Sequence, residues 1–88
     1  MKHTDFLAEA LKLIDERGQD YGDLDANFER VRMIFFAITG INLSSREAAL
    51  FLVSLKLARL KESPEKADHY TDGINYLAFA GQFASEGE

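Results

Sequence analysis

The chain has 88 residues, the length of one domain, and 47% of them are hydrophobic, which supports a folded core and excludes a disordered chain. It contains no cysteine, so disulfide bonds and thiolate metal sites are excluded. Ten Lys and Arg residues against 15 Asp and Glu residues give a net charge of −5, so we expect no nucleic acid partner held by bulk charge.

The first two predicted elements are helices that end at glycines. Apolar residues recur with a helical period over about residues 4–17 and again over about residues 23–39. Gly18 and Gly40 follow these segments directly, and glycine is the usual residue just past the end of a helix. Met33 and Phe36 lie off the apolar face of the second helix and are therefore candidates for association.

The last two predicted elements are helices whose starts are indicated by N-terminal capping patterns. Ser44 and Glu47 have the spacing of a capping box, which predicts a helix over about residues 45–62. Ser63-Pro64 has the pattern of an N-cap followed by a proline in the first turn, which predicts a helix over about residues 64–84. No segment has the alternation of a strand. Residues 1–88 therefore predict a single all-α domain, a compact four-helix bundle.

Sequence length and the apolar runs also bear on association and location. A chain this short forms a small core, and self-association is a common remedy, so we expect an oligomer. The N-terminus has no apolar run of the kind that a signal peptide needs. The run Met33 to Ile38, which no apolar run of the chain exceeds in length, is far shorter than the roughly 20 residues that cross a bilayer. We expect no membrane partner and a cytoplasmic location.

The helical wheel of the fourth segment separates an apolar from a polar face. It predicts that the apolar residues are buried: Ala67, Tyr70, Ile74, Leu77, Ala78 and Gly81. Asp68, Asp72 and Asn75 point the opposite way. Two carboxylates one turn apart can share a hard cation such as Mg²⁺, so Asp68 and Asp72 are candidate metal ligands. The alternative is a solvated helix face with a carboxylate near the helix start.

Four further side chains do not fit an ordinary amphipathic helix. Arg17 and Asn27 fall on the apolar faces of the first two helices, where they either tie the following loop to the bundle or face a ligand. Lys56 and Arg59 interrupt a third helix that is otherwise apolar on almost every side. We expect both cations to pair with carboxylates, above all Asp68 or Asp72, or to meet phosphate oxygens.

These residues, in this order, resemble a protein family. The resemblance covers about residues 7–80 and is carried by Arg17, the turn Asp20-Tyr21-Gly22-Asp23, Asn27-Phe28, the segment Leu55-Lys56-Leu57-Ala58-Arg59-Leu60, and Asp68 to Asp72 followed by Asn75-Tyr76-Leu77-Ala78. The chain resembles a short family common in phages and prophages, which is similar to the all-α MazG-like nucleoside triphosphate pyrophosphohydrolases. That likeness implies a helical oligomer in the cytoplasm of a bacterial host.

The resemblance also implies a function and assigns roles to residues. MazG-like enzymes hold Mg²⁺ with acidic residues on two helices and release pyrophosphate from nucleotides. By this likeness Asp68 and Asp72 hold Mg²⁺, and Lys56 and Arg59 contact phosphates. The remaining ligand-binding candidates are Arg17, Tyr21, Asn27 and Asn75, with Tyr21 and Asn27 at the base or sugar.

The sequence departs from that pattern in its acidic residues. His69 stands where the second acidic element of the family has a Glu, and the first acidic element is absent. The alternative to a nucleotide-binding protein with possible hydrolase activity is therefore a non-catalytic interaction module, a phage accessory protein. In that alternative, the charged residues of the third and fourth helices form structural ion pairs.

Overall fold

The computed structural model describes residues 1–87, with the exception of the Tyr21 side chain, and these residues form helices and no strand. The elements are α1 (His3–Tyr21), α2 (Leu24–Thr39), α3 (Ser45–Glu62) and α4 (Ala67–Ser85). The all-α prediction is thus confirmed for the described part of the chain. Within that part, no helix is both long and apolar enough to cross a bilayer.

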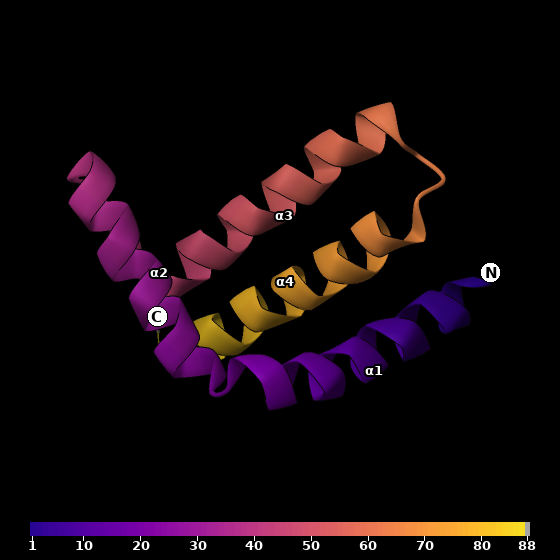
Figure 1. Cartoon of the computed structure of the whole chain (residues 1–88), viewed down its shortest axis with the longest axis horizontal. Coiled ribbons are helices and arrows are strands. Elements are labelled where there is room, and N and C mark those ends of the chain that lie inside the picture. The colour runs from indigo at the N-terminus through magenta and orange to yellow at the C-terminus, as the bar shows by residue number, and fades with distance from the viewer. Residues whose placement is uncertain (88) are drawn as a thin grey trace.

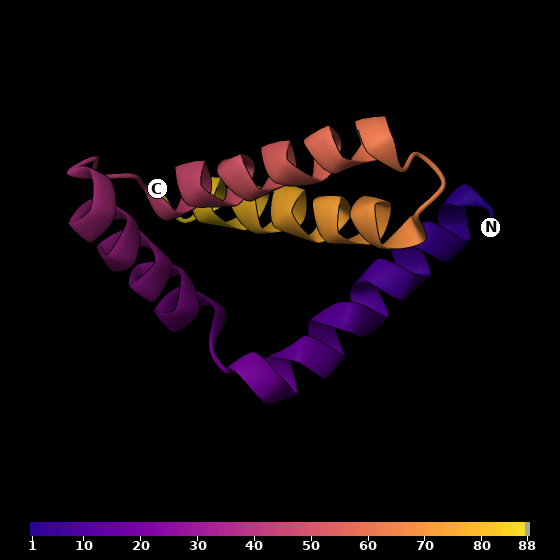
Figure 2. The same cartoon turned by 45° about the horizontal axis from the view of Figure 1, so that its top comes forward.

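The helices are arranged as an antiparallel pair with two arms. α3 and α4 run side by side, and α1 lies along the other side of α4 (Figure 1). α1 and α2 form the two arms of a V that meet below this pair, and α2 returns to the pair where α3 begins and α4 ends (Figure 2). The space between the arms therefore borders three or more helices.

Local signals explain most of the helix ends. The Asp23 carboxylate accepts a hydrogen bond from the Ala26 amide at 3.0 Å and caps α2. Gly40, with φ of 74°, ends α2 in the left-handed conformation that glycine adopts without strain. The capping box is confirmed, because Glu47 donates its amide to the Ser44 hydroxyl at 3.1 Å and Ser44 donates its amide to the Glu47 carboxylate at 3.0 Å.

Two predicted helix ends are wrong by about one turn. Gly18 does not end α1, which continues to Tyr21, and Gly22 at φ of 78° follows instead, donating its amide to the Gly18 carbonyl at 3.1 Å. α4 does not begin at Pro64 but at Ala67. The reason is that Ser63 already caps the end of α3, where its amide bonds to the Arg59 carbonyl at 3.0 Å, so a turn is needed before a new helix starts.

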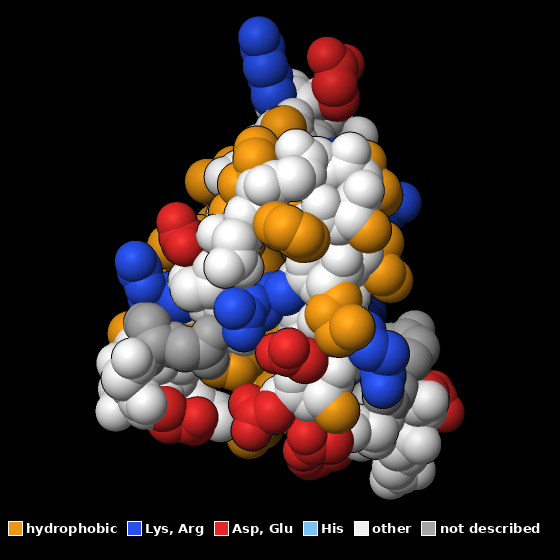
Figure 3. Space-filling model, turned by 90° about the vertical axis from the view of Figure 1, so that its left-hand side faces the viewer, with side chains coloured by type: hydrophobic (Ala, Val, Ile, Leu, Met, Phe, Trp, Pro, Cys, Tyr) orange, Lys and Arg blue, Asp and Glu red, His pale blue; other side chains and the backbone are white. Residues whose placement is uncertain are grey.

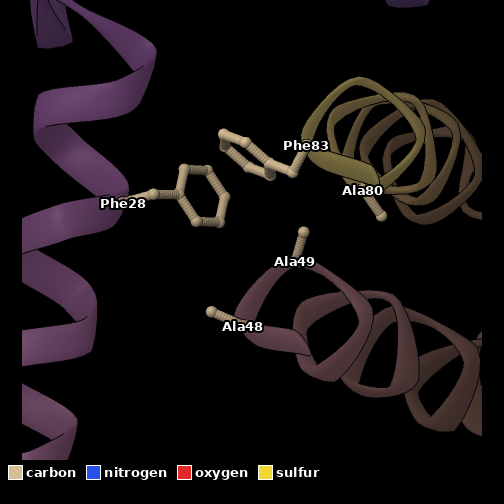
Figure 4. Packing of buried hydrophobic residues seen from close by; sticks show 5 residues of the cluster. All are labelled: Phe28, Ala48, Ala49, Ala80 and Phe83. Carbon is tan, nitrogen blue, oxygen red and sulfur yellow. The ribbon is translucent and has the colours of Figure 1, made fainter. Parts of the chain in front are cut away.

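The hydrophobic core lies where the start of α2 meets the start of α3 and the end of α4. Phe28 points from α2 towards Phe83 of α4, with ring centroids 5.2 Å apart, and small alanines of α3 and α4 close the cluster (Figure 4). Ala48, Ala49 and Ala80 are buried there. Such small side chains let helices approach closely.

The predicted buried face of α4 is wrong. Asp72 and Asn75 are buried, together with Thr71, whereas Tyr70 and Leu77 are exposed. The physical reason is that the polar side chains have partners on other helices, which a wheel drawn for one helix does not contain. α4 therefore turns its polar groups into the molecule and leaves an apolar stripe at the surface.

Candidate functional site

Asp72 joins three helices through two ion pairs. Asp72 is 7% exposed and lies on the inner face of α4. Carboxylate Oδ1 accepts a hydrogen bond from Arg17 Nη1 of α1 at 2.7 Å, and Oδ2 lies 2.9 Å from Lys56 Nζ of α3. The Lys56 side chain is 12% exposed, whereas that of Arg17 is 42% exposed. One carboxylate thus holds α1 and α3 to α4.

The two cations beside Asp72 determine the protonation state of its carboxyl group. Burial alone would raise the pKa of Asp72, but the hydrogen bonds from Lys56 and Arg17 outweigh it and hold the pKa below its ordinary value. Asp72 is therefore an anion at neutral pH. With two cations and one anion, the ion triad (Arg17, Asp72 and Lys56) carries a net charge of +1 in a chain whose total charge is −5.

Asn75 lies three residues after Asp72 and makes the next link to α1. Its side-chain nitrogen donates a hydrogen bond to the Ala10 carbonyl at 2.9 Å, and the residue is buried. A backbone carbonyl inside a helix is free to accept this second bond because it has two lone pairs. The link holds α1 against α4 one turn away from the ion triad.

A cavity of about 630 Å³ opens beside these groups, between α1, α2 and α4. Its polar lining comes from Arg17, Asp72, Asn75, Asn27 and Gln82. The rest of the lining is mainly apolar and aromatic: Leu13, Ile14, Leu24, Phe28, Val31, Leu52, Tyr76, Ala78 and Phe79. A cavity of this size, apolar with a few polar groups that converge, is typical of small-molecule sites.

Asn27 differs from the other polar groups of the cavity. Its side chain is half-buried and lines the wall that α2 contributes. The helix places it there because Asn27 stands one turn after the Asp23 cap. Among the described residues, no hydrogen bond is made by its side-chain amide. Asn27 therefore offers both a donor and an acceptor to the cavity.

The structure brings together some of the predicted site residues and separates others. Arg17, Asn27, Asp72 and Asn75 all line the cavity. Lys56 does not line it, but supports Asp72 from the α3 side, so the predicted pairing of Lys56 with Asp72 is confirmed.

Two other candidates, Asp68 and Arg59, stand apart from the cavity. Asp68 and Arg59 are exposed, and neither is part of its lining. Arg59 makes no ion pair with the described residues, so its predicted pairing with a carboxylate is wrong for that part of the chain. The Tyr21 side chain, predicted at the base or sugar, lies outside the described residues.

The two predicted Mg²⁺ ligands, Asp68 and Asp72, have different surroundings in the structure. Both carboxylate oxygens of Asp72 already face cations, and Asp68 points into solvent. Across the described part of the chain, no cluster of three or more His, Cys, Asp or Glu side chains is placed to hold a metal ion. Binding of Mg²⁺ by Asp68 and Asp72 stays a prediction.

Sequence reasoning missed Tyr76 and Gln82, which line the cavity from α4. Both lie within eleven residues of Asp72 on the same helix, and Tyr76 stands one turn after it. Had the inner face of α4 been recognised from the pairing of Asp72, the helical period would have placed Tyr76 there too. The helical spacing of Tyr76 from Asp72 is visible in the sequence, but it points to the cavity only once Asp72 is known to face inward.

Comparison with known proteins gives a family and a relative. A family model described as a domain of unknown function, DUF6378, matches residues 5–84. The Gene 55 protein of Mycobacterium phage L5 is 32% identical over 62 residues, a match that covers 69% of this chain and 40% of the phage protein. The chain thus spans less than half the length of that relative. No solved structure matches.

Proposed function

We propose a function from the geometry of the chain itself, because the chain belongs to DUF6378, a domain family of unknown function. Our proposal is that the chain is a nucleotide-binding module, with the ligand in the cavity between α1, α2 and α4. The observation that carries it is that an apolar cavity of about 630 Å³ is bordered by a positively charged triad and three side-chain amides.

Each part of a nucleotide has a counterpart in this cavity. The net positive charge of the ion triad favours a phosphate, which Arg17 can reach because its side chain is partly exposed. The amide of Asn27 offers a donor and an acceptor in one plane, which suits the edge of a base. Tyr76 adds an aromatic face for stacking.

We propose binding and not hydrolysis because the carboxylate of Asp72 is already engaged by two cations. MazG-like hydrolysis, the activity that the resemblance of the sequence implies, uses carboxylates that ligate Mg²⁺. Here a dication at Asp72 would have to displace the Lys56 ammonium and the Arg17 guanidinium, at 2.9 and 2.7 Å. We therefore assign Asp72 to positioning Arg17 at the cavity, and Lys56 to holding Asp72.

The second candidate is the non-catalytic interaction module. It is favoured by the same ion pairs, which link α1, α3 and α4 and would be needed in a purely structural role. In that case the cavity would have no affinity for nucleotides. The two candidates therefore differ in one measurable property.

Isothermal titration calorimetry with a panel of ribonucleoside and deoxyribonucleoside mono- and triphosphates, each with and without Mg²⁺, tests the proposal. We expect binding of at least one nucleotide without added Mg²⁺. Asn27→Ala should weaken that binding about threefold to tenfold, the value of one hydrogen bond. The matched control is Asn42→Ala, an exposed asparagine outside the cavity, which should bind as the unsubstituted chain does.

Three results would decide against the proposal. Absence of heat with every nucleotide would leave the interaction module as the function. Equal weakening by Asn27→Ala and Asn42→Ala would place the ligand outside the cavity. Binding that depends strictly on Mg²⁺ and is lost in Asp68→Asn would restore the predicted metal site, and pyrophosphate release would then identify a hydrolase.

A further inference from the structure

The molecule exposes more surface than its mass requires. Its accessible surface is 6118 Å², whereas a compact monomer of 9.9 kDa exposes about 5200 Å². The radius of gyration is 13.7 Å, compared with about 12 Å for a compact domain of this length. The excess of about 900 Å² is close to the roughly 800 Å² that each partner buries in a stable protein interface.

Three exposed apolar side chains lie along one edge of α2. Val31, Ile34 and Ile38 follow one another at spacings of three and four residues, the pattern of a seam between two helices. Ile34 is 60% exposed and Ile38 is 77% exposed. The same stripe begins with Leu24 and Asn27, which line the cavity. No charged residue interrupts it.

α3 adds exposed apolar side chains on the side that faces α2. The ring of Phe51 lies 6.2 Å from that of Phe35, which places Phe51 on the side of α3 that faces α2. Leu55 follows one turn later, and both residues are exposed. We define the apolar edge as the residues Val31, Ile34, Ile38, Phe51 and Leu55.

The opposite edge of α2 has a different character. There, Met33 and Phe36 lie beside Glu29 and Arg32, and the two charged residues form an ion pair at 3.2 Å. Seen from the side of α2, hydrophobic side chains are interspersed with other side chains, and the acidic side chains gather mainly near the bottom of the view (Figure 3). An apolar partner therefore suits the apolar edge better than the Met33 side.

We propose that a second copy of this chain packs against the apolar edge, with α2 of one subunit against α2 of the other about a twofold axis. The excess surface matches one subunit's share of such an interface. An uncharged stripe is self-complementary, and it brings no like charges together although each chain carries −5. Because Val31 also lines the cavity, the partner would narrow its mouth.

This dimer does not rest on nucleotide binding, and its test needs no ligand. Light scattering coupled to size-exclusion chromatography measures the mass of the full chain at micromolar concentration. We expect twice 9.9 kDa for the unsubstituted chain and a monomer for Ile34→Glu. Met33→Glu, a matched change at a similarly exposed position on the other edge of the same helix, should stay dimeric.

The folded state of each variant is checked by far-UV circular dichroism, and both side chains point into solvent, so the helical signal should not change. A monomeric mass for the unsubstituted chain would overturn the proposal. So would a dimer that survives Ile34→Glu together with Ile38→Glu. Dissociation by Met33→Glu but not by Ile34→Glu would move the interface to the opposite edge and equally overturn it.

Discussion

Asp72 shows how one side chain can set the arrangement of three helices. Its carboxylate is buried, and both of its oxygens face cations from other helices. Removal of one partner from such a group leaves an uncompensated charge inside the protein. Asp72→Asn would leave the Lys56 ammonium without its anion, while Arg17 could turn to solvent.

We expect Asp72→Asn to lower the free energy of unfolding by about 3 kcal/mol, the lower end of the range for broken buried pairs, because Arg17 is partly exposed. The matched control is Asp68→Asn, one turn earlier on the same helix and exposed, which should change it by less than about 0.5 kcal/mol. Urea denaturation measures both. Similar values for the two variants would mean that the ion triad adds nothing to stability.

The same two variants test how the free energy of unfolding depends on pH. Since the pKa of Asp72 is lowered in the folded state, its stabilisation is complete above the ordinary carboxyl pKa of about 4 and is lost as the pH falls through the lowered value. Between neutral and acid pH, the unsubstituted chain and Asp68→Asn should therefore lose more stability than Asp72→Asn. Parallel curves for all three would contradict the lowered pKa.

At the scale of the helix, the two glycines at the end of α1 have opposite roles. Gly18 is inside the helix, and a Cβ there would meet no atom within 4 Å, whereas Gly22 has φ of 78°. Gly18→Ala should raise the free energy of unfolding by about 0.5–1 kcal/mol through helix propensity, and Gly22→Ala should lower it by roughly 1–2 kcal/mol through strain. Thermal denaturation distinguishes the signs. A destabilised Gly18→Ala variant would mean that α1 ends at Gly18 after all.

Helix ends and helix faces differ in how well sequence predicts them. The Ser44–Glu47 box and the end of α2 at Gly40 were predicted, because these signals act within a few residues of chain. The predicted start of α4 was wrong because Ser63 caps the end of α3 and does not begin the next helix. The buried face of α4 was inverted because a wheel weighs hydrophobicity alone, while Asp72 is buried by partners that lie 55 and 16 residues away in the chain.

The candidate site was predicted in part for the same reason. Arg17 and Asn27 were identified as misplaced polar groups, and both line the cavity. Their meeting with Asp72 and Asn75 depends on how α1 and α2 pack on α4, which no local pattern contains. Lys56 was correctly expected to have an anionic partner, whereas Arg59, three residues later, turns outward.

At the scale of the whole molecule, the cavity and the excess surface have a common origin. α1 and α2 leave the α3–α4 pair and meet below it (Figure 2), and the cavity opens between these two helices and α4. That opening gives the cavity its entrance and leaves the apolar edge of α2 exposed. A ligand inside and a second copy outside would each cover part of this surface.

The most direct test of nucleotide binding in the cavity is a titration followed by ¹H–¹⁵N correlation NMR of the side-chain amides. We predict that a bound nucleotide shifts the NH₂ signals of Asn27 and Asn75, which line the cavity, and leaves that of Asn42, which does not, in place. Unchanged Asn27 and Asn75 signals at saturating nucleotide, or a shift confined to Asn42, would contradict the account.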